Sequence, residues 1–413
     1  MAESVKDQFF VLSKSTQLEV NEQRLLLNHV DITDLLVKDN SDISLKALEK
    51  SREIYQEWIG QQPNQNIVFL SGAGTSYGVG KGNIKGKTLK GLWDGLIAEY
   101  KDVMIGLIAK ASYPQDGTDL EALLTRAYRT YELSKDGDLK TMINTVEKFI
   151  TEQCSLEFEA VSTSAHSILL NKITKRKVGQ ARVKIFTLNY DTLFEQAASD
   201  QRFTIIDGFS FSNPKCFYGH SYDHDIVLRT GSRLKNEDNF IKKVFHLYKM
   251  HGSVDWLDDG KEIFQFPKEL IQQKLEADEN LKRVLIYPRD SKFELSYEQP
   301  YFEIIGRLQQ ALRAENTFLI TAGFSFCDKH IRSIILEALK QNPSLHLLAV
   351  TYPEIVADKE LRSFALIDNR IMLINETFTD FANTYPDNQS FSNEDPLEMI
   401  VSELARKLKG SKE

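Results

Sequence analysis

The sequence predicts an α/β fold in which helices cover both faces of a mostly parallel β-sheet and a large helical insertion interrupts the sheet. Short apolar runs recur from residue 183 onward, separated by helix-length spacers, an alternation typical of parallel strands joined by helices. One more apolar run, at 67–70, lies far upstream of the others. The stretch between them, from about 89 to 178, has helical periodicity almost throughout and predicts the insertion.

The first elements follow in chain order. Residues 1–60 are expected to form a helical N-terminal extension, because the apolar residues of SLKALEKSREIYQEWI (44–59) repeat at roughly helical spacing. The run IVFL is the first expected strand of an α/β domain that spans 61–384. In the insertion, TDLEALLTRAYRTYEL is the clearest helix, and its Thr118 and Glu121 form a capping-box pattern.

The later strands are expected at the apolar runs VKIFTL, FHLYKM, VLIY, TFLITA, LHLLAV and RIMLI. Beyond them, YPDNQSFSNEDP is polar and rich in turn-forming residues, which predicts a linker within the C-terminal segment 385–413. An amphipathic helix is expected at 396–408, with Asp395 as its cap and Pro396 at its first position.

Composition limits the classes of function. The 413 residues are 42% hydrophobic and carry a formal charge of -8, which argues against direct nucleic-acid binding over the whole surface. No apolar run reaches membrane-spanning length and the N-terminus lacks a signal-peptide pattern, so we expect a cytoplasmic protein without membrane contact. Cys154, Cys216 and Cys327 lie far apart, so neither a disulfide framework nor a metal site is expected.

A strand that ends in Gly72-Ala73-Gly74 places backbone N–H groups at a helix start, where they can approach a phosphate. The spacing of Gly72, Gly74 and Gly78 fits a tight turn equally well. A dehydrogenase would carry an acidic residue at the end of a second strand about 20 residues on. Asp94 lies in an expected helix instead, which disfavours a hydride-transfer enzyme.

Polar residues follow two other expected strands. Asn189 and Asp191 come directly after VKIFTL, and His251 follows FHLYKM. In open α/β sheets ligands bind at the carboxyl ends of the strands, and a histidine there can act as a general base near neutral pH. Taken singly, these residues also fit a helix cap, a solvated carboxylate and a hydrogen-bonded loop histidine. Together, they indicate a site at one edge of the sheet.

Four motifs occur in order over residues 66 to about 380: Gly72-Ala73-Gly74-Thr75-Ser76, Thr187-Leu188-Asn189-Tyr190-Asp191-Thr192-Leu193, Met250-His251-Gly252-Ser253 and Gly323-Phe324-Ser325. This set resembles the sirtuin family of NAD-consuming proteins. The resemblance implies a Rossmann-like domain with NAD across the strand ends. It further implies that Gly72, Ala73, Gly74 and Ser76 line the phosphates, Asn189 and Asp191 hold the nicotinamide ribose and carboxamide, His251 is the base, and Gly323 and Ser325 meet the adenosine side. The remaining motif residues Thr75, Thr187, Gly252 and Ser253 are assigned to the same dinucleotide.

The sequence departs from the deacylase pattern of that family. The four zinc-binding cysteines after the catalytic histidine are absent, the G-I-P-D-F-R loop is replaced, and Leu188 stands where deacylases have glutamine. The large helical insertion and the stretches TLNYDTLFE, KMHGSVDW and YPRDSKFELSYEQPY resemble instead the sirtuin-like NADases of bacterial antiphage defence. That resemblance implies NAD+ as substrate, no metal, and assembly as a homo-oligomer or with a hexameric translocase-type ATPase.

The residues alone are compatible with hydrolysis of NAD+. Nicotinamide leaves readily because the pyridinium is cationic, so the site mainly has to stabilise an oxocarbenium-like ribose and supply a nucleophile, with Asn189 and His251 placing it and Asp191 offsetting charge. Two alternatives stay open. A protein deacylase would use the same NAD site with an acyl-lysine nucleophile, and a non-catalytic NAD or ADP-ribose sensor would bind without turnover.

Overall fold

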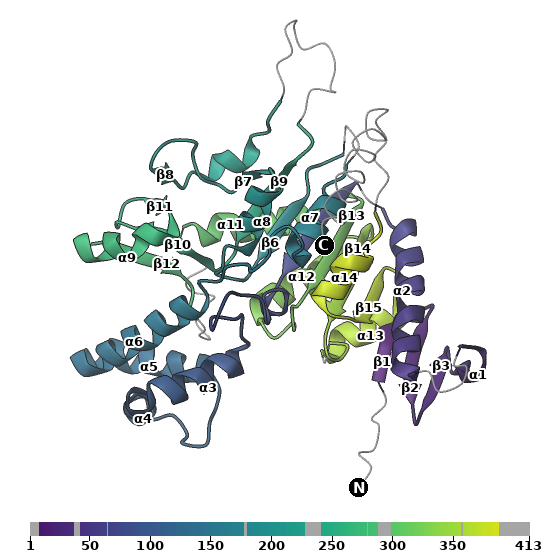
Figure 1. Cartoon of the computed structure of the whole chain (residues 1–413), viewed down its shortest axis with the longest axis horizontal. Coiled ribbons are helices and arrows are strands. Elements are labelled where there is room, and N and C mark those ends of the chain that lie inside the picture. The colour runs from purple at the N-terminus through teal and green to yellow at the C-terminus, as the bar shows by residue number, and fades with distance from the viewer. Residues whose placement is uncertain are drawn as a thin grey trace, which may run out of the picture.

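The computed structural model describes residues 8–36, 42–63, 65–176, 180–227, 241–278, 280–287, 299–356 and 358–387. The strands of its main sheet are β1 (Gln8–Leu12), β2 (Gln17–Asn21), β3 (Arg24–Leu27), β4 (Val30–Asp31), β5 (Asn66–Ser71), β6 (Lys184–Thr187), β7 (Thr204–Ile206), β9 (Val244–Lys249), β13 (Thr317–Ala322), β14 (Leu345–Thr351) and β15 (Ile371–Asn375). Their order is β4-β3-β2-β1-β15-β14-β13-β5-β6-β9-β7 (Figure 1). Every pairing from β15 to β7 is parallel, which confirms the predicted mostly parallel α/β sheet.

Helices cover both faces of the parallel strands. On one face lie α11 (Tyr301–Arg313), α12 (Lys329–Gln341) and α13 (Lys359–Ile367), and on the other α2 (Ile43–Gln61), α7 (Ala165–Ile173), α8 (Leu193–Asp200) and α14 (Phe378–Thr384). Alternate residues of β5 point to opposite faces of the sheet. Val68 and Leu70 belong to the core under α11, α12 and α13, and Ile67 and Phe69 belong to the core under the helices of the other face. Burial on both faces explains why these strands are continuous apolar runs.

The N-terminal region differs from the helical extension that we expected. The helix at 44–59 is present as α2, but residues 8–31 form strands β1 to β4, which the short α1 (Thr33–Leu36) follows. β1 pairs antiparallel with β15 and continues the sheet past its parallel part. The pattern QFFVL supplies apolar groups to both cores, so pairing at an open sheet edge outweighs any local helical tendency.

The helical insertion comprises α3 (Leu89–Glu99), α4 (Lys101–Lys110), α5 (Leu120–Ser134) and α6 (Gly137–Gln153), which pack around a core of their own. Helix α7 falls within the predicted insertion range but packs on the sheet. The cap of α5 is Asp119 rather than Thr118, because the Asp119 carboxylate accepts from the amides of Glu121 and Ala122.

A second sheet of four antiparallel strands lies beside the main one, in the order β12 (Lys282–Leu285), β10 (Gly252–Asp258), β11 (Ile263–Gln265) and β8 (Lys215–Cys216). The run VLIY, expected in the parallel sheet, belongs to β12 and the residues after it. The chain reverses between β9 and β10 at Met250 and His251, so β10 pairs with β12 instead of extending the parallel ladder. Helix α9 (Lys268–Ala277) connects β11 to β12.

The predicted linker within 385–396 lies almost wholly beyond the described residues, and the amphipathic helix at 396–408 lies entirely beyond them. Within the described ranges, none of the helices combines the length and apolar character needed to cross a membrane.

Candidate active site

The sheet changes direction of winding between β5 and β13. From β5 the chain continues to β6 and β9 on one side, and from β13 it continues to β14 and β15 on the other. The two strands are neighbours in register, with Ser71 opposite Ala322 at their carboxyl ends. Gly72 and Gly323 therefore meet at the topological switch point, the place where open α/β sheets bind ligands.

The glycines of these two turns pack backbone against backbone. Gly74 N donates to Gly323 O at 3.0 Å, and Gly323 has a φ of +61°. A Cβ on Gly72 would lie 2.5 Å from Gly323 O, and one on Gly74 would lie 2.6 Å from Gly323 Cα. The glycines are thus required for the close approach of the two turns, independently of any ligand.

The turn offers fewer amides to a ligand than its sequence suggested. The N–H groups of Gly72, Gly74, Thr75 and Ser76 already donate to main-chain carbonyls. Ala73, at the first position of the 3-10 turn η1 (Ala73–Thr75), lines the pocket, and its N–H has no acceptor among the described residues. Ala73 N–H is therefore the amide that this turn presents.

A pocket of about 220 Å³ opens at the switch point. Eight of the predicted site residues line it: Gly72, Ala73, Ser76, Asn189, Asp191, His251, Gly323 and Ser325. The helical insertion also lines the pocket, through residues that include Leu92, Glu121, Gln153 and Cys154. The structure therefore brings together, in one cavity, predicted residues from four separate motifs.

The other predicted residues lie behind this lining. Thr75 and Thr187 are buried, and their hydroxyls accept from Asn189 Nδ2 and from Asn189 N, each at 3.1 Å. Ser253 is buried as well and donates to Tyr190 O at 3.3 Å. Gly74 and Gly252 form turns. These residues contact the site residues rather than the cavity.

Asn189 is held in one orientation. Its Nδ2 donates to Gly72 O at 3.1 Å and to Ser76 Oγ at 2.8 Å, and because a carbonyl only accepts, the amide nitrogen must face that turn. No described residue donates to Asn189 Oδ1. This oxygen is available to accept a hydrogen bond from water or a ligand hydroxyl.

Asp191 is buried and both of its oxygens have partners. Oδ2 accepts from Ser76 Oγ at 2.6 Å, and Oδ1 accepts from Leu193 N at 3.1 Å in the first turn of α8. The carboxylate is therefore fixed beside the pocket as a negative charge rather than as a mobile group.

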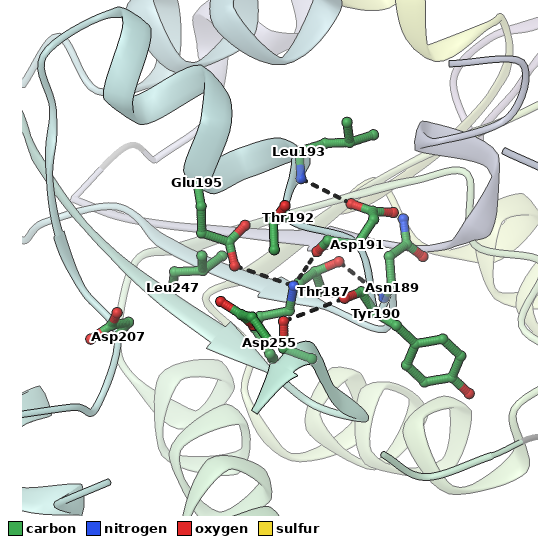
Figure 2. A network of polar contacts seen from close by, with 12 residues as sticks. Thr187, Asn189, Tyr190, Asp191, Thr192, Leu193, Glu195, Asp207, Leu247 and Asp255 are labelled. Carbon is green, nitrogen blue, oxygen red and sulfur yellow. Dashed lines mark hydrogen bonds and ion pairs between the residues drawn. The ribbon is translucent and has the colours of Figure 1, made fainter. Parts of the chain in front are cut away.

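A buried ammonium lies beneath the same loop. Lys249, at the end of β9, is 2% exposed, and its Nζ donates to the main-chain carbonyls of Asp191 and Tyr190 and to Glu195 Oε1 at 3.2 Å. Figure 2 shows the Asn189–Asp191 loop with Glu195 and Asp255 close by. Burial raises the pKa of Glu195 to about 7, against the attraction of the Lys249 charge.

His251 is buried in the turn between β9 and β10. Its Nε2 lies 3.6 Å from Oδ2 of Asp328, a pocket residue that caps α12. The ring of Tyr190 is 6.5 Å from the imidazole between centroids, and the Tyr190 hydroxyl donates to Ile286 O. The imidazole is thus enclosed by an aromatic ring and a carboxylate.

Sequence reasoning missed Asp328, Lys249, Glu195 and Cys154. Asp328 carried a usable signal, because an aspartate six residues past the strand TFLITA and before an amphipathic helix is a typical N-cap. No signal in the sequence distinguished Lys249 from other lysines at strand ends. Cys154 enters the pocket from the insertion, and burial raises its pKa to about 12, so the thiol stays protonated at neutral pH.

Among the residues that the structure describes, no group of three His, Cys, Asp or Glu side chains could hold a metal ion. That the reaction needs no metal stays a prediction.

Residues 183–372 match the family model described as SIR2-like domain. Among curated proteins, no sequence matches the chain. A solved structure concerned with the basis of sirtuin substrate affinity is 14% identical, with a TM-score of 0.39, over 81% of this chain and 97% of that one. A Sir2 mutant with a p53 peptide and NAD is 13% identical, with a TM-score of 0.38, over 81% and 96%. The chain therefore contains a region similar to the SIR2-like domain, residues 183–372, which contributes Asn189, Asp191 and His251 to the pocket.

Proposed function

We propose that the protein is an NAD+ glycohydrolase that releases nicotinamide and ADP-ribose. The observation that carries the proposal is the convergence of Asn189, Asp191 and His251 on the pocket formed by the Gly72 and Gly323 turns at the switch point of the sheet. The match of residues 183–372 to the SIR2-like domain supports NAD as the ligand.

The proposed reaction needs only groups that the pocket contains. The bond between the ribose C1′ and the pyridinium nitrogen breaks, its electron pair moves to that nitrogen, and nicotinamide leaves neutral. Water adds to C1′, and its proton passes to His251 and then to solvent. Asn189 Oδ1 accepts from the attacking water, which aligns the oxygen with C1′. Each such contribution is on the order of 10² to 10⁴ in rate.

Asp191 has a role distinct from that of Asn189. Because Ser76 and Leu193 already occupy its oxygens, the carboxylate acts mainly through its charge, which stabilises the positive charge that develops on the ribose. An N–H of the nicotinamide carboxamide would have to donate to an Asp191 oxygen that already accepts from Ser76 or Leu193. Ala73 N–H is the group proposed to meet the pyrophosphate.

The test is incubation of the purified protein with NAD+, with and without an acetylated peptide, followed by product analysis. Free ADP-ribose in both samples supports hydrolysis. O-acetyl-ADP-ribose would identify a deacylase, and NAD+ that stays unchanged at every protein concentration, with measurable binding, would identify a sensor. Asn189→Ala and His251→Ala are each expected to abolish turnover, whereas His224→Ala, an exposed histidine that does not line the pocket, should leave it unchanged.

We further infer a cellular role as a cytoplasmic, NAD-depleting effector of antiphage defence that is controlled by assembly. Uncontrolled hydrolysis of NAD+ would harm the cell that makes the enzyme. The proposed partner is a second copy of this chain or a hexameric translocase-type ATPase. Light scattering at several protein concentrations, paired with turnover on the same samples, tests this control. A monomer that hydrolyses NAD+ at full rate without a partner would contradict it.

A further inference from the structure

We propose that Asp328 is the positioning residue for His251: it fixes the imidazole through Nε2 and stabilises the imidazolium that forms when His251 takes a proton. The catalytic part of this inference rests on the proposed NAD+ hydrolysis. The effect of the carboxylate on the imidazole does not, and it can be measured without turnover.

The two groups are close and shielded from solvent. His251 Nε2 and Asp328 Oδ2 are 3.6 Å apart, and the two side chains are only 11% and 12% exposed. An ion pair in such surroundings is screened less by water and salt than one at the surface. A negative charge at this distance therefore favours the protonated imidazole.

The two oxygens of Asp328 have separate tasks. Oδ1 accepts from His330 N at 3.1 Å and from Ile331 N at 3.2 Å, which caps α12. Oδ2 is the oxygen that faces His251. Because the cap prevents rotation of the carboxylate, Oδ2 is held in place before any ligand binds, as preorganised catalytic groups require.

Other titratable groups line the pocket or lie on the elements near the turn that carries His251. Those that line the same pocket are Tyr190, Asp191, Glu121, Cys154, Cys327 and Lys87. Lys249 and Asp255 lie on the hairpin of His251 itself. Tyr287 follows Ile286, whose N–H donates to His251 O, the Tyr301 hydroxyl lies beside Gly252, and His330 is in α12. Burial raises the pKa of Tyr190 and of Cys154, so both stay neutral near pH 7. Asp191 is engaged by Ser76 and Leu193. Oδ2 of Asp328, in contrast, lies 3.6 Å from His251 Nε2.

The chain offers a substitution that separates the cap from the charge. Asparagine caps helices as well as aspartate does, so Asp328→Asn should preserve the start of α12 while it removes the negative charge. The acid limb of the pH profile of kcat/KM is expected to move to lower pH by roughly one unit, because the imidazolium loses its counter-charge. At neutral pH kcat should fall by about tenfold or more, with KM within about twofold.

The matched control is Asp119→Asn. Asp119 caps α5 through the same two kinds of amide contact but does not line the pocket, so its pH profile should equal that of the wild type. An Asp328→Asn profile that coincides with the wild type would overturn the proposal. A rise in KM with unchanged kcat would overturn it too, because Asp328 would then bind substrate.

A second measurement does not depend on turnover. The pKa of the His251 imidazole can be followed by NMR of protein with ¹³C-labelled histidine, the signal being assigned by its loss in His251→Gln. Asp328→Asn is expected to lower that pKa, and no change would refute the pairing. If the wild type leaves NAD+ intact at every protein concentration while the imidazole pKa still shifts, the proposed function fails and the His251–Asp328 pair stands.

Discussion

The hydroxyl of Ser76 donates a 2.6 Å hydrogen bond to Asp191 Oδ2 across 115 residues of sequence. The same oxygen of Ser76 accepts from Asn189 Nδ2 at 2.8 Å. One hydroxyl in the glycine turn after β5 therefore links the two polar residues of the loop after β6. The orientation of both depends on a residue of a different motif.

Removal of the Ser76 hydroxyl is expected to reduce turnover more than it reduces stability. In Ser76→Ala the carboxylate of Asp191 and the amide of Asn189 lose a shared partner, which should cost about 1 kcal/mol of unfolding free energy and about tenfold or more in kcat. Ser71→Ala is the control, because Ser71 is also buried and hydrogen-bonded, to Thr75, but does not line the pocket. Equal kinetic losses in the two variants would argue against a specific role for Ser76.

The Lys249–Glu195 pair should behave as a buried ion pair whose partners depend on each other. Lys249→Met leaves the Glu195 carboxylate buried without its cation and removes the donor to the Asp191 and Tyr190 carbonyls, so we expect a loss of about 3 kcal/mol in urea unfolding. The double variant Lys249→Met with Glu195→Met should recover much of that stability, since no unpaired charge remains. Turnover should stay low in both variants, because neither contains the ammonium that donates to the carbonyls of Tyr190 and Asp191. Full activity in the double variant would show that the loop needs no anchor.

Gly323→Ala tests the close packing of the two glycine turns. Its φ of +61° is unfavourable for alanine, and the new Cβ would meet the backbone of Gly74 at 2.6 Å. Gly82→Ala provides the control, because Gly82 has the same φ of +61° with nothing within 4 Å of its Cβ position. We expect the free energy of unfolding to fall by about 1 kcal/mol in the Gly82 variant and by about 1–3 kcal/mol more in the Gly323 variant. The Gly323 variant should also lose NAD+ binding. Similar losses in both variants would mean that the turns can separate without cost.

His166 should make stability fall in mild acid. It is 1% exposed among Phe158, Phe194 and Phe378, neither ring nitrogen has a hydrogen-bond partner in the described part of the chain, and burial lowers its pKa from 6.5 to about 3. Below pH 6.5 the unfolded chain takes up a proton at this imidazole and the folded chain does not. The unfolding free energy should therefore decrease as the pH falls from 6.5 toward 3, by about 1 kcal/mol per pH unit from this group.

His166→Phe removes this titration and keeps an aromatic ring at the position. Urea unfolding at pH 7.5 and pH 5.5 should show a smaller loss for the variant than for the wild type, by about 1 kcal/mol. Stability at pH 7.5 should be retained, because no hydrogen bond is lost. An identical pH dependence of both proteins would show that this imidazole does not resist protonation in the folded state.

Chelation of metal ions is expected to leave the protein unaffected. The described residues contain no group of three ligating side chains, and the chain has no Cys-x-x-Cys pair. Turnover and thermal unfolding should therefore be equal with and without EDTA. Loss of activity in EDTA that zinc restores would refute this prediction.

The parallel strands and the residues at their ends could be predicted because they depend on local pattern. Buried parallel strands are continuous apolar runs, so VKIFTL and TFLITA were identified without knowledge of their neighbours. Their carboxyl ends lie at one edge of a sheet, and this placed Asn189 near the Gly72 turn. The strands at 8–31 were missed because they depend on pairing: β1 pairs with β15, and β2 to β4 follow it through antiparallel neighbours.

The chemical groups of the site can be read from the chain alone: a glycine turn, an amide, a carboxylate and an imidazole, each after a strand. Their partners depend on how the chain folds. The Ser76–Asp191 hydrogen bond and the contact of His251 with Asp328 join segments that are distant in the chain, and they exist because β5 and β13 are neighbours at the switch point. Hydrophobic periodicity specifies which face of a strand is buried but not which strand lies beside it, so such contacts appear only when the sheet is assembled.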